Sequence, residues 1–316
     1  MLKEKPRSEY GHQARRKQTI HTVLLIVLAL VLCGSAGVVI VGWRSRLGTE
    51  KKELLRLWDE GTYDTAFELS RTGLENKPTD YFLLTLHGFA SYQLAIAQIN
   101  SFDTLTYIDE CIWSLRKALM TKNGVNDGRV QYVLGKAYYY KGSGYAELAI
   151  QFLEEARELS YTARDIPEYL GLSYAAIQDY RSSVEAFSQA LDPGEGESDY
   201  PSDLLLLAIA RSYIALEELE TAKAYLVRCI EISRDSNTVI TARLLLGDIM
   251  LKAGNPDEAE AQYMAILEDD GENAEAHFQL GELYIAGGDG TRARAEWRRA
   301  LRIDSTHARA RSRLNL

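Results

Sequence analysis

Small and large side chains recur along residues 66–300 with a spacing that repeats seven times. In each copy two small residues stand seven positions apart, and a large residue follows the first of them by four. Residues at i, i+4 and i+7 share one face of an α-helix, so each triad predicts one helix with a packing face. Ser70 and Ile266 break the size rule. The triads are Ala66/Ser70/Gly73, Cys111/Leu115/Ala118, Ala149/Leu153/Ala156, Ser183/Phe187/Ala190, Ala222/Leu226/Cys229, Ala259/Tyr263/Ile266 and Ala293/Trp297/Ala300.

Another small residue precedes six of the triads and marks a second helix in each copy. It stands 12 positions before the triad in four copies, 14 in one and 23 in another. A large residue follows it by three positions, except where Ser91 follows Gly88. These pairs are Gly88/Ser91, Gly135/Tyr138, Gly171/Tyr174, Ala210/Tyr213, Gly247/Met250 and Gly281/Tyr284. Each copy is therefore predicted to be a pair of helices.

The pattern resembles the tetratricopeptide repeat, a helix-turn-helix of 34 residues with Gly and an aromatic on its first helix and Ala, an aromatic and Ala on its second. The resemblance covers residues from about 50 to 305. It implies an all-α, right-handed α-solenoid of about seven repeats. We expect the repeats to occupy residues 53–305 and residues 306–316 to form a capping segment. Small residues let paired helices approach, so Gly281 should pack against Trp297.

The first two copies depart from the pattern. The first has Leu54 and Leu57 where its first helix should carry the glycine and the aromatic residue. The second carries 11 extra residues around the sequence AIAQINSFDTLTYIDE. If both of its helices are longer, they form a protruding hairpin that is suited to docking. The alternative is a disordered internal loop.

An uncharged segment at residues 22–43 predicts a transmembrane helix, because its 22 residues are long enough to cross a hydrocarbon core. Residues 1–21 would then be a cytoplasmic basic tail and residues 44–52 a juxtamembrane linker. Lys and Arg flank the segment about equally, so the orientation rests on the short basic tail and the long C-terminal domain. The alternative is a signal peptide cleaved near Gly34-Ser35-Ala36, although the apolar run continues beyond that point.

The charge of the chain is uneven. Residues 58–290 carry 17 basic and 39 acidic side chains, a net charge of −22, whereas residues 291–316 carry eight arginines and two acidic residues. An acidic body repels DNA and RNA, so no nucleic-acid partner is expected. The arginine-rich end is either a solvated helix, a docking face for an acidic partner or a contact with anionic lipid or nucleic acid. Its charge, opposite to that of the body, also permits head-to-tail self-association.

No motif for catalysis, a cofactor or a metal stands out. The five histidines lack partners at metal-ligand spacing, and we expect His87 and His277 to pack in the core. Cys111 and Cys229 replace alanine in their triads and are too far apart for a disulfide. The glycine-rich turns lack the lysine of a phosphate loop. We therefore expect no enzymatic activity and no cofactor.

The predicted partner site is the concave groove, which the resemblance lines with residues of the first helices before and after the packing glycine. The lysine and asparagine that clamp a peptide carboxylate in some family members are absent, and Lys136 alone does not replace them. Aromatic groove residues favour an extended peptide or a helix held by apolar contacts. The alternative is that these tyrosines only pack repeat against repeat. The groove residues are Phe82, Thr85, Phe89, Tyr92, Tyr132, Lys136, Tyr139, Tyr140, Arg211, Ile214, Asp248, Leu251 and Lys252.

The predicted function is a membrane-anchored scaffold without catalytic activity. The layout is similar to bacterial inner-membrane proteins that carry tetratricopeptide repeats in the periplasm for envelope or flagellar-motor assembly. This similarity implies protein partners bound in the groove or at the extended second repeat. Two alternatives remain: a receptor for client polypeptides facing the cytosol, and a regulatory tether for a separate enzyme.

Overall fold

The computed structural model describes residues 48, 50–98, 101–122, 126–191 and 201–315. Within these ranges every regular element is a helix. The first covers residues 50–59. It is followed by α2 Tyr63–Asn76, α3 Tyr81–Ile96, α4 Ser101–Leu119, α5 Gly128–Lys141, the short 3-10 helix η1 Ser143–Tyr145, α6 Ala146–Glu158, α7 Ile166–Ala176, α8 Tyr180–Ala190, α9 Asp203–Ala215, α10 Leu219–Ile232, α11 Ser236–Lys252, α12 Pro256–Asp269, α13 Ala274–Ala286, α14 Gly290–Ile303 and α15 Ala308–Leu314.

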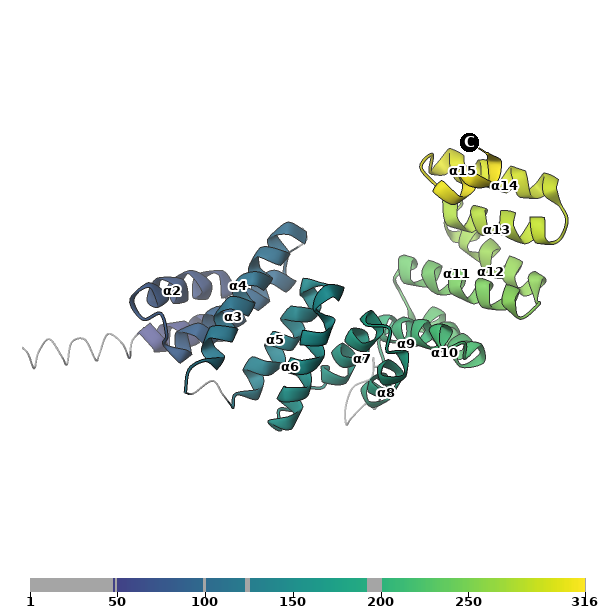
Figure 1. Cartoon of the computed structure of the whole chain (residues 1–316). Helices are drawn as coiled ribbons and strands as arrows, with labels where there is room; N and C mark the ends of the chain where they lie inside the picture. Colours follow the sequence, from purple (N-terminus) through teal and green to yellow (C-terminus); the bar gives the residue numbers. More distant parts are fainter. Residues whose placement is uncertain (1–47, 49, 99–100, 123–125, 192–200, 316) are drawn as a thin grey trace, which may run out of the picture.

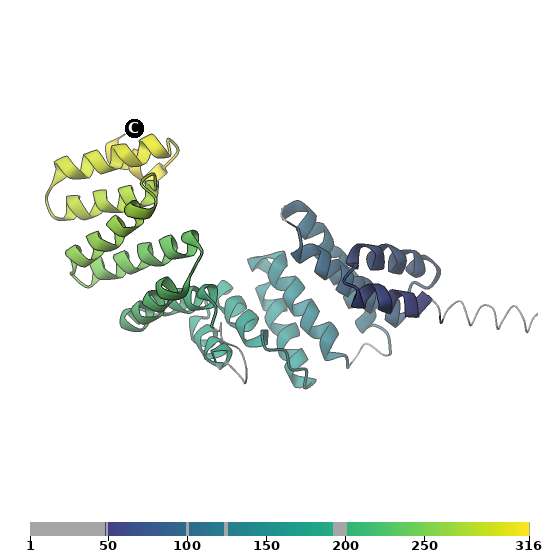
Figure 2. The ribbon, with the colours of Figure 1, turned by 180° about the vertical axis from the view of Figure 1, so that it is seen from behind.

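The helices form seven consecutive hairpins arranged along one curved array. The two views in Figures 1 and 2 show the pairs following one another, with the helix over residues 50–59 and the C-terminus at opposite ends. The first helices of successive pairs contact each other: α3 contacts α5, and α5 contacts α7. They form one layer, and the second helices form the other. This arrangement confirms the predicted all-α solenoid and its number of repeats.

The predicted spacing of small and large residues explains how the two helices of a pair pack together. A Cβ atom added at Gly171 would lie 2.5 Å from the Phe187 ring, and one at Gly135 would lie 2.6 Å from Leu153 Cγ. A methyl group has no room at these distances, so glycine is needed for the close approach. Alanine serves at position 210, where Ala210 packs in one apolar cluster with Leu226. The offsets read from the sequence are confirmed as helix contacts.

The second repeat has longer helices than its neighbour. Its α3 and α4 contain 16 and 19 residues, whereas α5 and α6 contain 14 and 13. Figure 1 shows the α3–α4 hairpin reaching beyond the adjacent pair. Of the extra residues around 96–106, residue 96 and residues 101–106 are helical, and residues 97–98 belong to the turn after α3. The longer hairpin is therefore confirmed.

The C-terminal helix α15 covers the last repeat, as the sequence predicts. Ala310 is fully buried, and it shares an apolar cluster with Phe278 and Trp297. The guanidinium of Arg309 donates a hydrogen bond of 2.6 Å to the Glu275 carboxylate on α13. A short amphipathic helix thus shields the apolar face that a further repeat would cover.

The predicted N-terminal tail, residues 1–21, and the predicted membrane span, residues 22–43, lie outside the described residues. The end of the predicted linker, residues 50–52, belongs to the first helix. Among the helices that are described, none combines the length and the apolar character needed to cross a membrane.

Candidate partner-binding surface

A lysine surrounded by tyrosines lies where the first helices α3, α5 and α7 meet. Its ammonium nitrogen, Lys136 Nζ, lies 2.6 Å from the Asp165 carboxylate and 3.0 Å from the Tyr132 hydroxyl oxygen. The same nitrogen is 4.5 Å from the ring centre of Tyr169 and 5.5 Å from that of Tyr92. The carboxylate balances the charge, and the rings add cation–π attraction. Lys136 is therefore engaged within the chain, and its charge is not free to clamp a peptide carboxylate.

The tyrosine hydroxyls around Lys136 form a connected shell. Burial raises the pKa of Tyr92, Tyr132 and Tyr169, so these hydroxyls stay protonated and can donate hydrogen bonds. Tyr132 donates to Asp165 over 2.7 Å. The Tyr169 and Tyr140 hydroxyls share a hydrogen bond of 3.0 Å. This network fixes the rings of α5 and α7 against each other and supports the surface beside them.

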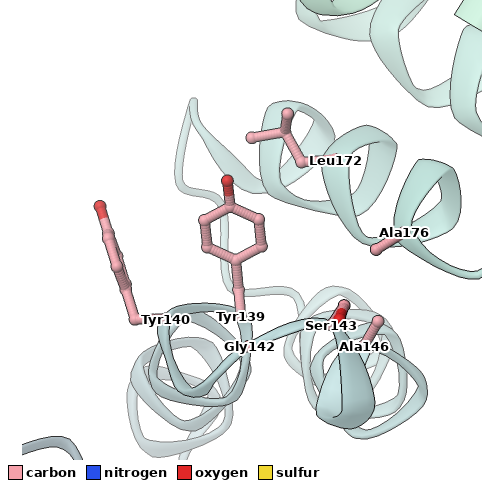
Figure 3. A pocket seen from close by; sticks show the side chains of 7 residues that line it. All are labelled: Tyr139, Tyr140, Gly142, Ser143, Ala146, Leu172 and Ala176. Carbon is pink, nitrogen blue, oxygen red and sulfur yellow. The ribbon is translucent and has the colours of Figure 1, made fainter. Parts of the chain in front are cut away.

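A pocket of about 460 Å³, which we call the tyrosine pocket, opens next to this shell. Figure 3 shows the Tyr139 ring standing between Tyr140 and Leu172. Ala176 faces the same space from α7. The turn after α5 and the start of α6 complete the lining with Gly142, Ser143 and Ala146. Apart from the tyrosine hydroxyls and Ser143, the lining side chains are apolar, so the pocket suits an apolar side chain of a partner.

The sequence identified two of the seven residues that line this pocket. Tyr139 and Tyr140 were predicted, whereas Leu172 and Ala176 were not. Both follow the offset rule, because they stand one and five positions after Gly171, as Lys136 and Tyr140 do after Gly135. Applying the same offsets to the fourth repeat would have found them. Asp165 and Tyr169 gave no comparable signal.

A second pocket of about 420 Å³ lies at the corresponding place three repeats further on. Leu251 and Leu283 line it from the first helices α11 and α13. Its polar side differs from that of the first pocket: Tyr284 donates a hydrogen bond of 2.6 Å to Glu260, and the Arg292 guanidinium lies 4.5 Å from the Tyr284 ring centre. The solenoid therefore has a similar cavity at two corresponding places, and the polar groups that line the two cavities differ.

The predicted groove residues of α3 are mostly engaged in packing. Thr85 is buried, and its hydroxyl donates to the Tyr81 carbonyl over 2.9 Å. The Lys51 ammonium nitrogen lies 5.0 Å from the centre of the Phe82 ring. Phe89 is half-buried. The exposed part of the predicted groove therefore begins with α5.

The remaining predicted residues lie on α9 and α11, away from the tyrosine pocket. Arg211 and Lys252 are exposed, and Ile214 is half-buried. Asp248 accepts a hydrogen bond of 2.8 Å from the Tyr263 hydroxyl, and burial raises the pKa of the Asp248 carboxyl. The predicted groove thus consists of a largely aromatic part on α3 and α5 and a mixed polar and apolar part on α9 and α11.

Three residues from different helices form a serine, histidine and carboxylate series that the sequence did not reveal. Ser70 Oγ lies 2.9 Å from His87 Nδ1, and His87 Nε2 lies 3.0 Å from Glu110 Oε1. Ser70 is fully buried, and its hydroxyl donates to the Phe67 carbonyl over 2.8 Å. No substrate can reach this hydroxyl, so the series connects α2, α3 and α4 and does not provide a nucleophile. The expected core position of His87 is confirmed.

Family models match the second half of the solenoid. Residues 205–236 and residues 244–308 each match a model described as tetratricopeptide repeat. These two segments are similar to tetratricopeptide repeats. Proteins built from these repeats generally act as scaffolds for protein–protein interaction. No curated protein sequence is significantly similar to the chain.

Solved tetratricopeptide-repeat structures share the fold. The C-terminal part of a repeat-containing protein from Cytophaga hutchinsonii is 16% identical, with a TM-score of 0.60, and covers 84% of this chain and 100% of its own. PilF from Pseudomonas aeruginosa is 14% identical, with a TM-score of 0.53, and covers 72% and 96%. YrrB, described as having an unusual peptide-binding site, is 23% identical, with a TM-score of 0.50, and covers 64% and 98%. At these identities the likeness extends to the fold alone.

Proposed function

We propose that this protein is a non-enzymatic scaffold, anchored in a membrane by residues 22–43, that holds an extended segment of a partner protein on its first-helix layer. The proposal places the repeats outside the cytoplasm, on the periplasmic side of a bacterial inner membrane, where they would assist envelope or flagellar-motor assembly. The anchor follows from the length of the uncharged segment. The binding role follows from the repeats.

The tyrosine pocket is the observation that carries the binding role. Tyr139, Leu172 and Ala176 leave an apolar cavity of about 460 Å³ open on the surface, while the shell around Lys136 holds the walls in place. A rigid apolar pocket binds a side chain without first paying for its own ordering. The occupant that fits it is an apolar side chain of an extended peptide, whose backbone can bond to the Tyr139 hydroxyl.

A photoreactive side chain in the pocket tests the binding role. We expect one placed at Ala176 of the full-length chain to cross-link a discrete partner, and one at the exposed residue Ala224 on α10 to give no such product. Leu172→Arg introduces a charge into the pocket and should reduce cross-linking at least about tenfold, as loss of a central apolar contact does. Equal labelling at both positions, or full labelling with Leu172→Arg in a normally folded chain, would contradict the proposal.

A reporter fused to the C-terminus, active only outside the cytoplasm, tests the location. We expect the reporter to be active while the full-length protein stays in the membrane fraction. A silent reporter on an intact fusion would reject the periplasmic location and favour a receptor facing the cytosol. An active reporter on a protein released from the membrane would instead show cleavage of the N-terminal segment.

A further inference from the structure

The arginines at the C-terminal end fall into two groups. Half of them are paired with acidic side chains of the same end of the solenoid. Arg292 lies 2.6 Å from Asp289. The other pairs are Arg299 with Glu296, Arg309 with Glu275, and Arg313 with Glu282. Arg309 and Arg313 hold α15 against α13, Arg292 lies at the start of α14, and Arg299 pairs within α14. These four arginines are therefore not available to a partner.

Three of the unpaired arginines form one line along α14. Arg294, Arg298 and Arg302 are exposed, and the described part of the chain brings no acidic side chain within ion-pair distance of any of them. They stand four residues apart, so about 6 Å of helix rise separates each from the next. We name these three residues the arginine stripe. Three guanidinium groups at this spacing can each bind one carboxylate on a facing helix.

The outer helix α6 carries acidic groups at the same spacing. Glu147, Gln151 and Glu155 also stand four residues apart, and Glu158 continues their face at the end of the helix. Glu147 and Glu158 are exposed, and Glu155 is half-buried. Glu155 accepts a hydrogen bond of 2.8 Å from Gln151, and no basic side chain among the described residues pairs with these glutamates. We name these four residues the acidic stripe.

The two stripes cannot meet within one molecule. α6 belongs to the third hairpin and α14 to the seventh, and both views show them far apart along the array. Both are second helices, which lie in the layer opposite the first helices. The acidic stripe begins at Glu147, beside the pocket-lining Ala146, and continues along α6 away from the pocket, whereas the arginine stripe lies at the far end of the array.

From this complementarity we infer that the arginine stripe docks on the acidic stripe of a second copy of this chain. Arg294 and Arg302 stand eight positions apart, as Glu147 and Glu155 do, so each of these arginines can pair with one carboxylate. Arg298 then faces the side-chain amide oxygen of Gln151. Reversing the helix direction leaves this match intact. A net charge of −22 on residues 58–290 repels nucleic acid and anionic lipid. The same charge attracts an arginine stripe from another copy.

The contact formed this way is weak and depends on salt. Exposed ion pairs are individually small and are screened at high ionic strength. The association should therefore be seen at about 50 mM salt and weaken about tenfold or more by about 500 mM salt. Confinement of anchored chains to one membrane would raise their local concentration, but the docking itself does not rest on the anchor or on the pocket.

Charge reversal in the full-length chain tests the inference by energy transfer between two differently labelled samples in mild detergent. The variant with Arg294→Glu, Arg298→Glu and Arg302→Glu should not self-associate, nor should the variant with Glu147→Arg and Glu155→Arg. Mixing the two variants should restore association, because the charges are complementary again. A matched control, Arg181→Glu with Arg234→Glu and Arg311→Glu, makes the same charge change at exposed arginines outside the stripe and should associate like the wild type.

Three results would overturn the inference. The first is a wild-type chain that shows no energy transfer at low salt. The second is loss of association in the control variant, which would indicate a general effect of charge. The third is failure of the mixture to recover when circular dichroism shows both variants folded. Binding of anionic vesicles or of nucleic acid that disappears with the arginine variant, without self-association, would assign the stripe to that ligand instead.

Discussion

Replacing Gly281 by alanine is expected to destabilise the last repeat by up to about 2 kcal/mol, although alanine is the better helix former. Intrinsic propensity alone would stabilise helix α13 by about 1 kcal/mol. A Cβ at this position would, however, overlap the Trp297 indole, which is a rigid ring held in the core. Overpacking of this kind costs about 1 to 3 kcal/mol. The sign of the change in unfolding free energy therefore shows whether packing or helix propensity has the larger effect at position 281.

Hydrogen exchange of the amides in α13 and α14, together with urea unfolding, measures this effect. Gly144→Ala is the matched control, because a Cβ at Gly144 meets no atom within 4 Å. We expect the control to be close to neutral. Combining Gly281→Ala with Trp297→Leu should cost less than the sum of the two changes, since the smaller side chain makes room for the methyl group. A more stable Gly281→Ala variant would refute the packing interpretation.

The fold was largely predictable because helix contacts in a solenoid constrain side-chain size at fixed offsets. The glycines at 171 and 281 pack against the large residues that the spacing named. The exception at Ser70 also has a physical reason. In that repeat the fully buried Leu54 stands where the first helix of other repeats has glycine or alanine, and the Ser70 hydroxyl meets His87.

The polar contacts were not predictable from the sequence. Asp165 reaches Lys136 from a loop 29 positions away, and Glu110 reaches His87 across 23 positions. Helix periodicity gives the face on which a side chain lies, but it does not say which loop carboxylate arrives there. The groove prediction accordingly named Lys136 and its tyrosines without the partner that neutralises the lysine.

Replacing Asp165 by alanine is expected to cost about 3 kcal/mol, because it removes the ion-pair partner of the buried Lys136 ammonium. The Lys136 side chain is only 11% exposed. Its charge would have to stay desolvated or draw water into the tyrosine shell. Adding Lys136→Met to Asp165→Ala should recover most of this stability, since an apolar side chain of similar length suits the cage. Urea unfolding of the three chains measures the effect.

Asp109→Ala is the matched control, because it removes the partner of another lysine, Lys141, at the same separation of 2.6 Å but with an Asp109 side chain that is 60% exposed. Such surface pairs contribute about 0 to 1 kcal/mol. Equal losses for the two aspartates would show that the Lys136 site is solvated. If the loss at Asp165 is the larger, the double variant Lys136→Met with Asp165→Ala shows whether Lys136 contacts the partner or only supports the pocket. We expect partner cross-linking at Ala176 to survive in this variant, because the pocket walls remain although the lysine charge is gone.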